Sequence, residues 1–300
     1  GGKTEEKTAV IEIAKAAGLT LLSEEERNPL YTTTYGVGEV IKDAVRNGCR
    51  KFIVGIGGSA TNDGGAGMLQ ALGFGLLKEN GEQIPIGARG LEELAEITDD
   101  NVIPELAECK FKIACDVTNV LCGETGASAV YGPQKGADEE MTERLDRLLF
   151  SYASLVKKKI PKADSMYPGT GAAGGLGFAF LTFMDAQLES GIQIVIKETG
   201  LEQEIAKADL VITGEGRMDG QTAMGKAPIG IAKIAKKYGK PVIAFAGAAA
   251  RDAGACNEQG IDAFFPILRE AVSLEAAMKR ENAEANMEAA VEQAYRLCRL

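Results

Sequence analysis

The stretch KFIVGIGGSATNDGGAGMLQALG, residues 51–73, lays out a strand, a loop and a helix in succession. Its apolar run 52–56 predicts a buried strand, and residues 66–72 predict a helix. The loop between them holds two glycine pairs and four polar side chains, Ser59, Thr61, Asn62 and Asp63. Glycines allow close backbone approach, and the start of a helix offers unpaired N–H groups and a positive dipole. Because a turn needs only one or two polar residues, the excess indicates an anion or phosphoryl site.

The composition is that of an ordinary globular chain with an acidic charge balance. The 300 residues carry a net charge of −10, with 45% apolar and 25% charged residues. The sequence has no basic stripe with interleaved aromatic residues, which argues against nucleic acid and anionic membranes as partners. It has no apolar run of about 18 residues, the length of a membrane span. We therefore expect a cytoplasmic protein.

Histidine is absent, and the six cysteines form no C-x-x-C motif. These features argue against a zinc site and favour reduced thiols in core positions. The absence of histidine also excludes Ser-His-Asp and Cys-His catalysis. Any general base must therefore be Asp, Glu, Lys, Tyr or water.

Strand and helix patterns alternate along the rest of the chain, as is typical of a parallel α/β sheet. We expect strands at 8–13, 111–116, 192–196, 210–213, 242–246 and 264–268. We expect helices at 38–47, 138–158, 178–191, 227–238 and 273–300. After residues 191–200 the sequence changes to short apolar strand patterns that alternate with helix patterns. We therefore predict a larger mixed α/β domain over 1–195 and a second α/β domain over 196–300.

The first loop admits two other interpretations. Residues 55–60 fit G-x-G-x-x-G/A loosely, but a dinucleotide site needs an acidic residue about 20 positions later, at the end of a second strand. Glu79 has that spacing but lies beside the turn residues Asn80-Gly81. A Walker A motif is excluded because no Gly-Lys-Ser/Thr closes the loop. A plain structural turn remains an alternative to the substrate or phosphoryl loop that we favour.

Two charged residues and a third glycine-rich turn also suit a site. Asp116 ends the predicted strand 111–116, where α/β proteins collect catalytic groups. Lys135 follows Gly-Pro-Gln on a turn, where it could balance phosphate charge. A turn cap for Asp116 and a surface position for Lys135 remain alternatives. The turn 169–177 could cradle a phosphate through backbone N–H groups, or it could only allow close packing.

A fourth cluster follows the predicted strand 210–213 directly, in the sequence TGEGRMDGQTAMGKAP of residues 213–228. It mixes both charge signs within a short segment, through Glu215, Arg217, Asp219 and Lys226. The basic side chains could neutralise phosphoryl charge, and the acids could hold Mg²⁺ or accept a hydroxyl proton. A solvated loop rarely needs such a mixture, so we favour a functional interpretation.

Together these segments resemble the motifs of the bacterial type I glycerate kinase family. The resemblance rests on GIGGSATNDGGAGMLQALG (55–73), ACDVTN (114–119), GPQKGA (132–137), GAAGGLGF (171–178) and TGEGRMDGQTAMGKAP (213–228). The motifs occur in the order of the family and span most of the chain. A single motif would not be specific, but five in register are.

The resemblance implies ATP-dependent phosphorylation of D-glycerate, with the 2-hydroxyl favoured and with Mg²⁺ as the metal. It also implies two α/β domains, one a mixed glycerate-kinase domain and the other a flavodoxin-like domain with a doubly wound parallel sheet. Family members carry an upstream strand, a D-S-F-K-G-like loop and an A-D-G-G-E-G segment that this sequence lacks. We therefore expect a chain shortened at its N-terminus, with an incomplete flavodoxin-like sheet.

Our hypothesis for the site is in-line phosphoryl transfer in a cleft between the two domains. Asp63 or Asp116 would orient or deprotonate the glycerate hydroxyl. The predicted catalytic set is Asp63, Asp116, Lys135 and Arg217, and the predicted substrate set is Gly57, Gly58, Ser59, Thr61 and Asn62. The predicted nucleotide set is Gly174, Gly175, Gly214, Glu215, Asp219, Gln221 and Lys226, with Glu215 and Asp219 as Mg²⁺ ligands.

A non-catalytic binder of small carboxylates or nucleotides on the same scaffold is the alternative. The dense mixture of acids and bases in residues 215–226 favours chemistry over binding alone. A homo-oligomer is left open by the sequence.

Overall fold

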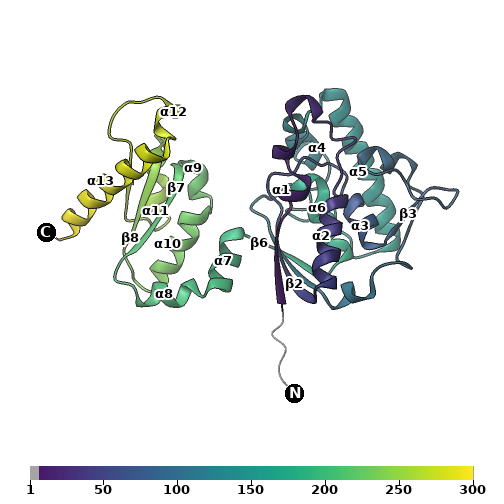
Figure 1. The fold of residues 1–300 in the computed structure, drawn as a ribbon, viewed down its shortest axis with the longest axis horizontal. Coiled ribbons are helices and arrows are strands. Elements are labelled where there is room, and N and C mark those ends of the chain that lie inside the picture. Colours follow the sequence, from purple (N-terminus) through teal and green to yellow (C-terminus); the bar gives the residue numbers. More distant parts are fainter. Residues whose placement is uncertain (1–6, 300) are drawn as a thin grey trace, which may run out of the picture. The chain divides into compact units, whose positions relative to one another are not determined.

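The structure is a computed structural model that describes residues 7–299. The chain divides between Gly191 and Ile192 into two compact units (Figure 1), each with a hydrophobic core of its own. The boundary expected after residue 195 falls inside helix α7 (Gly191–Thr199).

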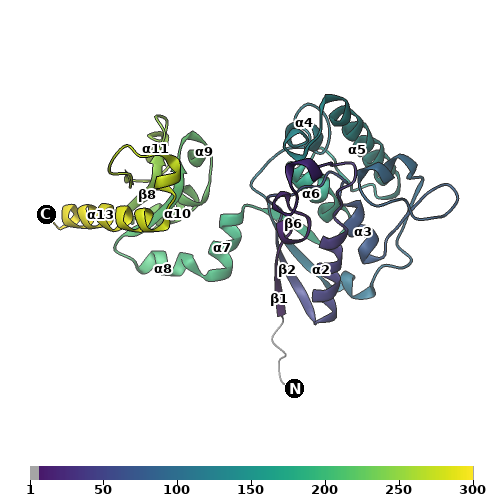
Figure 2. The same cartoon turned by 45° about the horizontal axis from the view of Figure 1, so that its top comes forward.

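The first unit is built on a four-stranded parallel sheet in the order β1-β2-β5-β6. Its strands are β1 (Lys7–Glu12), β2 (Cys49–Gly55), β5 (Lys110–Ala114) and β6 (Ala186–Glu189). The inner strands pair Phe52 with Phe111, and the two rings stack with their centroids 4.6 Å apart. Parallel sheets are normally covered by helices, and α2 (Tyr35–Arg46) and α3 (Ala66–Leu72) lie side by side next to this sheet (Figure 2).

The longest helix of the first unit is α5 (Glu139–Lys159), whose two ends follow directly from the sequence. Asp138 caps its start by accepting a hydrogen bond of 2.8 Å from the backbone N–H of Met141. Three lysines at 157–159 suit the negative end of the helix dipole. The remaining elements of the unit are α1 (Ala14–Ala17), α4 (Ala127–Tyr131), α6 (Ala172–Phe183), the antiparallel pair β3 (Gly75–Leu77) and β4 (Glu96–Thr98), and the 3₁₀ turns Leu19–Leu21, Glu24–Glu26, Ala88–Glu93, Pro104–Glu108 and Pro133–Lys135.

The second unit contains a three-stranded parallel sheet in the order β7-β8-β9. The strands are β7 (Val211–Met218), β8 (Val242–Ala249) and β9 (Ala263–Pro266). The buried side chains of Val211, Ile229 and Val242 belong to one core cluster, which joins the sheet to α10 (Ala227–Lys237). The other helices of the unit are α7, α8 (Leu201–Lys207), α9 (Gly220–Ala223), α11 (Ala255–Glu258), α12 (Leu274–Ala277) and α13 (Arg280–Cys298).

Three sequence-based expectations were wrong in detail. Residues 192–196 form helix α7 instead of a strand, and Ile192 packs against Gly230 of α10. The helix expected over 178–191 ends at Phe183, and residues 186–189 pair with β5 as strand β6. The closing helix expected over 273–300 is divided into α12 and α13 because Lys279 is extended, and residue 300 lies outside the described residues.

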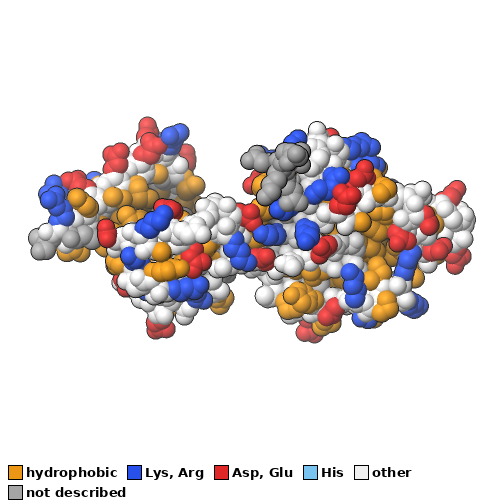
Figure 3. Space-filling view, turned by 90° about the horizontal axis from the view of Figure 1, so that it is seen from below, with side chains coloured by type: hydrophobic (Ala, Val, Ile, Leu, Met, Phe, Trp, Pro, Cys, Tyr) orange, Lys and Arg blue, Asp and Glu red, His pale blue; other side chains and the backbone are white. Residues whose placement is uncertain are grey.

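The prediction of two α/β units with parallel sheets is confirmed. On the face drawn in Figure 3, acidic and basic side chains are interspersed. Within residues 7–299, no helix combines the length and the apolar character that crossing a bilayer requires.

Candidate active site

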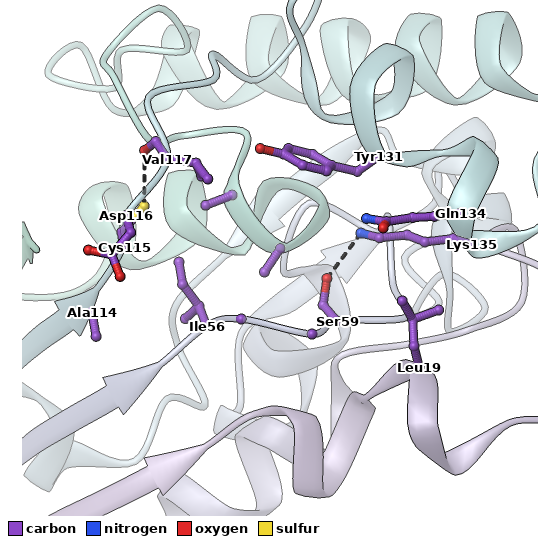
Figure 4. A pocket seen from close by; sticks show the side chains of 14 residues that line it. Leu19, Ile56, Ser59, Ala114, Cys115, Asp116, Val117, Tyr131, Gln134 and Lys135 are labelled. Atoms are coloured by element: carbon purple, nitrogen blue, oxygen red, sulfur yellow. Dashed lines mark hydrogen bonds between the residues drawn. The ribbon is translucent and has the colours of Figure 1, made fainter. Parts of the chain in front are cut away.

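A pocket of about 300 Å³ lies in the first unit, at the carboxyl ends of β2 and β5 (Figure 4). In parallel α/β sheets this edge is where ligands bind, because the loops that follow the strands meet there. Five predicted site residues line the pocket, namely Gly57, Gly58, Ser59, Asp116 and Lys135. The structure therefore brings together parts of three motifs, which lie at residues 55–73, 114–119 and 132–137 of the sequence.

Lys135 is the most unusual side chain of this pocket, since it is 2% exposed and reaches the pocket from the short turn Pro133–Lys135. Its Nζ donates hydrogen bonds to Ser59 Oγ at 3.0 Å and to the carbonyl oxygen of Thr61 at 2.6 Å. Burial lowers the pKa of Lys135 to about 8, and the nearby charge of Asp63 opposes this effect. The surface position considered for Lys135 is therefore wrong.

Asp116 supplies the acidic side of the pocket. It lies two residues past the end of β5 (Lys110–Ala114), which is shorter than the strand expected over 111–116. Its Oδ1 accepts a hydrogen bond of 3.0 Å from the backbone N–H of Gly191. This bond orients the carboxylate, which is otherwise exposed. Figure 4 shows Asp116 and the Ser59–Lys135 pair at opposite sides of the pocket, with the Tyr131 side chain above the space between them. The arrangement offers a buried cation at one side and an accessible base at the other.

Asp63, a predicted catalytic residue, does not line the pocket. Its fully buried carboxyl accepts hydrogen bonds from the backbone N–H groups of Thr34, Gly65 and Gly67, and from the Thr34 hydroxyl. Burial raises the pKa of Asp63, while these hydrogen bonds oppose the rise. These hydrogen bonds show that Asp63 connects and stabilises the N-terminal ends of α2 and α3.

Thr61 and Asn62, both predicted to bind substrate, also lie behind the pocket floor. Thr61 is 1% exposed and Asn62 is fully buried, and Asn62 Nδ2 donates to Ser128 Oγ at 2.9 Å. Only Ser59 of the four polar side chains in this loop lines the pocket.

The third glycine-rich turn supports the first loop from behind. Ala173, Gly174 and Gly175 all have left-handed backbone angles, with φ of 53°, 66° and 91°. A Cβ at Gly174 would lie 2.0 Å from the carbonyl oxygen of Thr61, and the Gly174 carbonyl accepts a bond of 2.9 Å from the N–H of Gly64. Gly174 and Gly175, predicted to bind nucleotide, therefore pack against protein instead of lining the pocket.

In the second unit, the charged cluster begins on a strand instead of in a loop, because β7 continues to Met218 and carries Gly214, Glu215 and Arg217. Asp219 caps α9 by accepting hydrogen bonds from the N–H groups of Gln221 and Thr222. These bonds, together with Lys226, lower the pKa of Asp219.

The same cluster is tied together through Thr222, whose hydroxyl donates to Glu215 Oε1 at 2.5 Å. Lys226 Nζ lies 3.7 Å from Asp219 Oδ1. Glu215, Asp219 and Lys226 therefore gather around Thr222, whereas the Arg217 and Gln221 side chains are exposed.

The model of the glycerate kinase family matches residues 2–299 of the sequence. The chain belongs to the glycerate kinase family. It is 50% identical over 274 residues to a glycerate kinase of Halalkalibacterium halodurans, an alignment that covers 91% of this chain and 72% of the relative. It is 49% identical over 273 residues to glycerate 2-kinase of Escherichia coli, again covering 91% and 72%.

Solved structures give the same assignment of family and fold. A crystal structure of a provisionally assigned glycerate kinase 2 from Salmonella typhimurium LT2 superposes with a TM-score of 0.84. The two sequences are 47% identical, and the alignment covers 97% of this chain and 76% of the other. The relatives are longer than this glycerate kinase family chain.

The cluster in the second unit has a donor set that suits Mg²⁺. Magnesium ions in kinases commonly bind through one or two carboxylates, with water and substrate phosphates completing the shell. Glu215 and Asp219 offer such a pair because both contact Thr222. Within residues 7–299, no group of three or more acidic, cysteine or histidine side chains could hold an ion by protein ligands alone.

Several pocket residues of this family member were not found from the sequence. The Tyr131 hydroxyl donates to Asn119 Oδ1 at 2.6 Å, and this bond fixes the ring against the pocket. Gln134 and Ala173 also line the pocket. Asn119 ends one recognised motif and Tyr131 precedes another, so the motif boundaries were the available signal.

Proposed function

We propose that this chain is an ATP-dependent kinase that phosphorylates D-glycerate, with the 2-hydroxyl preferred, and that it belongs to the type I group of its family. Family membership and relatives named glycerate kinase support the reaction, and the Escherichia coli relative supports the 2-position. The observation that carries the proposal is the pocket of about 300 Å³ with a buried lysine on one side and an accessible carboxylate on the other. Those two contacts suit the carboxylate and the hydroxyl of a small hydroxy acid.

Asp116 is the base that we assign to the substrate hydroxyl. Its carboxylate is exposed to the pocket and is oriented by the N–H of Gly191. It would accept the hydroxyl proton as the substrate oxygen bonds to the γ-phosphorus of ATP and the bond from that phosphorus to the bridging oxygen of ADP breaks. Positioning and charge neutralisation supply most of the catalysis in such transfers.

The cluster of the second unit is our candidate for the nucleotide. Glu215 and Asp219 would hold Mg²⁺, which would neutralise phosphate charge. Lys226 and Arg217 would add positive charge beside the same phosphates. Gly214 is required by the sheet, because a Cβ there would lie 2.4 Å from the carbonyl oxygen of Phe245.

The test is an ADP-release assay with D-glycerate and MgATP, followed by NMR of the product. We expect glycerate-dependent ADP release, and a phosphorus coupled to the C2 proton of 2-phosphoglycerate. A product phosphorylated on C3 would reject the preferred position while keeping the reaction. Binding of glycerate without ADP release would reject the kinase and favour the non-catalytic binder.

A further inference from the structure

Within the described part of the chain, no carboxylate forms a hydrogen bond or an ion pair with the buried ammonium of Lys135, although the charge of Asp63 lies near enough to favour it. Its two hydrogen-bond acceptors, Ser59 Oγ and the Thr61 carbonyl oxygen, are neutral. An ammonium has three N–H donors, so these bonds leave one donor for a further acceptor. Charges as buried as this one are normally paired, since desolvation of an unpaired charge is costly. The pocket beside Lys135 is where an anionic partner would fit.

The lining of the pocket limits the charge of that anion. Among residues 7–299, Lys135 is the one basic side chain and Asp116 the one acidic side chain that line the pocket. A triphosphate carries several negative charges and normally needs a metal ion or several cations. A single ammonium beside a serine hydroxyl matches a monoanionic carboxylate better.

We propose that Lys135, with Ser59, is the receptor for the carboxylate of the substrate, and that it takes up a proton from alkaline solution when it binds that carboxylate. The identity of the substrate as glycerate rests on the proposed function. The class that follows is a small 2-hydroxycarboxylate, held by its carboxylate at Lys135 with its hydroxyl directed toward Asp116. Lys135 therefore selects acids over neutral polyols and amides.

Proton uptake follows from the state of Lys135 before the substrate arrives. With its pKa lowered to about 8 by burial, a part of the lysine is neutral above neutral pH. A bound carboxylate within hydrogen-bond distance favours the charged form and so raises that pKa. Binding then converts the neutral fraction to ammonium, and affinity falls as pH rises above about 8.

The other titratable groups around the pocket do not produce the same signal. Burial raises the pKa of the Cys115 thiol and of the Tyr131 hydroxyl above their ordinary values, so both are protonated near pH 8. Burial raises the pKa of Asp63, but this carboxyl does not line the pocket and is hydrogen-bonded to the N–H groups of Thr34, Gly65 and Gly67 behind its floor. Asp116 is exposed and lies on the opposite side of the pocket from Lys135 (Figure 4). Proton uptake between pH 7 and 9 therefore reports on Lys135.

The first experiment measures binding of D-glycerate, without ATP, by calorimetry at pH 7. The variant Lys135→Met removes the charge at similar length, and Lys158→Met removes an exposed charge of the same unit. We expect Lys135→Met to weaken binding on the order of 10- to 100-fold, as for loss of a charged hydrogen bond, and Lys158→Met to leave it unchanged. Glyceramide, the neutral amide of glycerate, should bind weakly to the wild type and to both variants, with the same affinity for all three proteins. Equal affinity of Lys135→Met and wild type for glycerate would overturn the proposal.

The second experiment needs no variant and remains decisive if Lys135→Met does not fold. Glycerate binding to the wild-type chain is measured in pairs of buffers with different ionisation enthalpies. We expect uptake of about half a proton per glycerate at pH 8 and of much less than that at pH 7. Absence of uptake at both pH 8 and pH 9 would overturn the proposal.

These results are separable from the outcome for the kinase reaction. Lysine-dependent binding of glycerate without ADP release would reject the proposed function and keep the carboxylate receptor. Conversely, ADP release with a glycerate KM that Lys135→Met leaves unchanged would keep the kinase and reject the receptor.

Discussion

The substitution Lys135→Met should remove a pH dependence that the buried ammonium gives to the stability of the first unit. Burial holds the pKa of Lys135 near 8 in the folded chain, whereas the unfolded chain returns it to its ordinary value of 10.5. Between these two values the unfolded state binds more protons than the folded state. The unfolding free energy of the wild type therefore rises as pH rises through this window.

The magnitude follows from the two pKa values. Their separation means that the ammonium destabilises the fold at neutral pH by about 3 kcal/mol, relative to a neutral amine in the same place. Between pH 7 and pH 9 about 1 kcal/mol of this loss is recovered in the wild type. The variant also loses the hydrogen bonds to Ser59 and Thr61, at about 1–3 kcal/mol for each acceptor left unsatisfied. That loss does not change with pH, so the pH-dependent difference isolates the buried charge.

The assay is urea denaturation at pH 7 and pH 9 with pulsed hydrogen exchange, in which peptides from α5 report on the first unit alone. The free energy of the wild type minus that of Lys135→Met should increase by about 1 kcal/mol from pH 7 to pH 9. Thiols with a raised pKa, such as those of Cys115 and Cys122, lower the unfolding free energy as pH rises. They do so equally in the wild type and the variant, so their contribution cancels when the two free energies are subtracted. A difference that is constant between the two pH values would refute a charged, buried Lys135.

Three further predictions concern the candidate site and its support. Asp116→Asn should lower kcat/KM for glycerate on the order of 100-fold or more, because the base is lost. The control is Asp100→Asn, which changes an exposed carboxylate of the same unit. A near-normal kcat/KM of Asp116→Asn in the ADP-release assay would reject the role of Asp116 as the base. Gly174→Ala should lower the unfolding free energy by more than about 2 kcal/mol, because its Cβ would lie 2.0 Å from the Thr61 carbonyl oxygen; an unchanged urea midpoint would contradict this. Asp219→Ala should raise the KM for MgATP and leave that for glycerate unchanged, and the opposite pattern in initial-rate kinetics would move the nucleotide elsewhere.

The inner strands could be predicted from sequence because long apolar runs such as 52–56 must be buried. Strand β6 could not, since Ala186–Glu189 is only partly buried and its pairing with β5 decides its conformation. Helix α7 was misassigned for the converse reason. The β-branched residues in 192–196 favour a strand, but the buried Ile194 and Ile196 and the contact of Ile192 with Gly230 belong to a helix.

The sequence could place Asp116 and Lys135 at the pocket because each follows a local pattern that fixes its position in the fold. A residue just past the carboxyl end of a strand in a parallel sheet lies at the edge where ligands bind. A lysine on a glycine-bounded turn is held in place by that turn. No comparable rule predicts where the side chains of Thr61, Asn62 and Asp63 point. In an irregular loop each side chain follows its own backbone angles, so counting polar residues could not show that these three point inward.

The polar excess of the first loop is explained by the scaffold instead of by direct ligand contact. Asp63 binds the N–H groups at the starts of α2 and α3, and the Thr61 carbonyl oxygen and Ser59 hydroxyl accept bonds from Lys135. The charge of Asp63 also favours the ammonium form of Lys135 against the effect of burial. Replacing Asp63 would therefore weaken both the fold and the charge that we assign to substrate binding. With the roles that we propose, the effect of such a replacement on glycerate use would arise through Lys135. Asp63 would then be a positioning residue, and Asp116 would be the base.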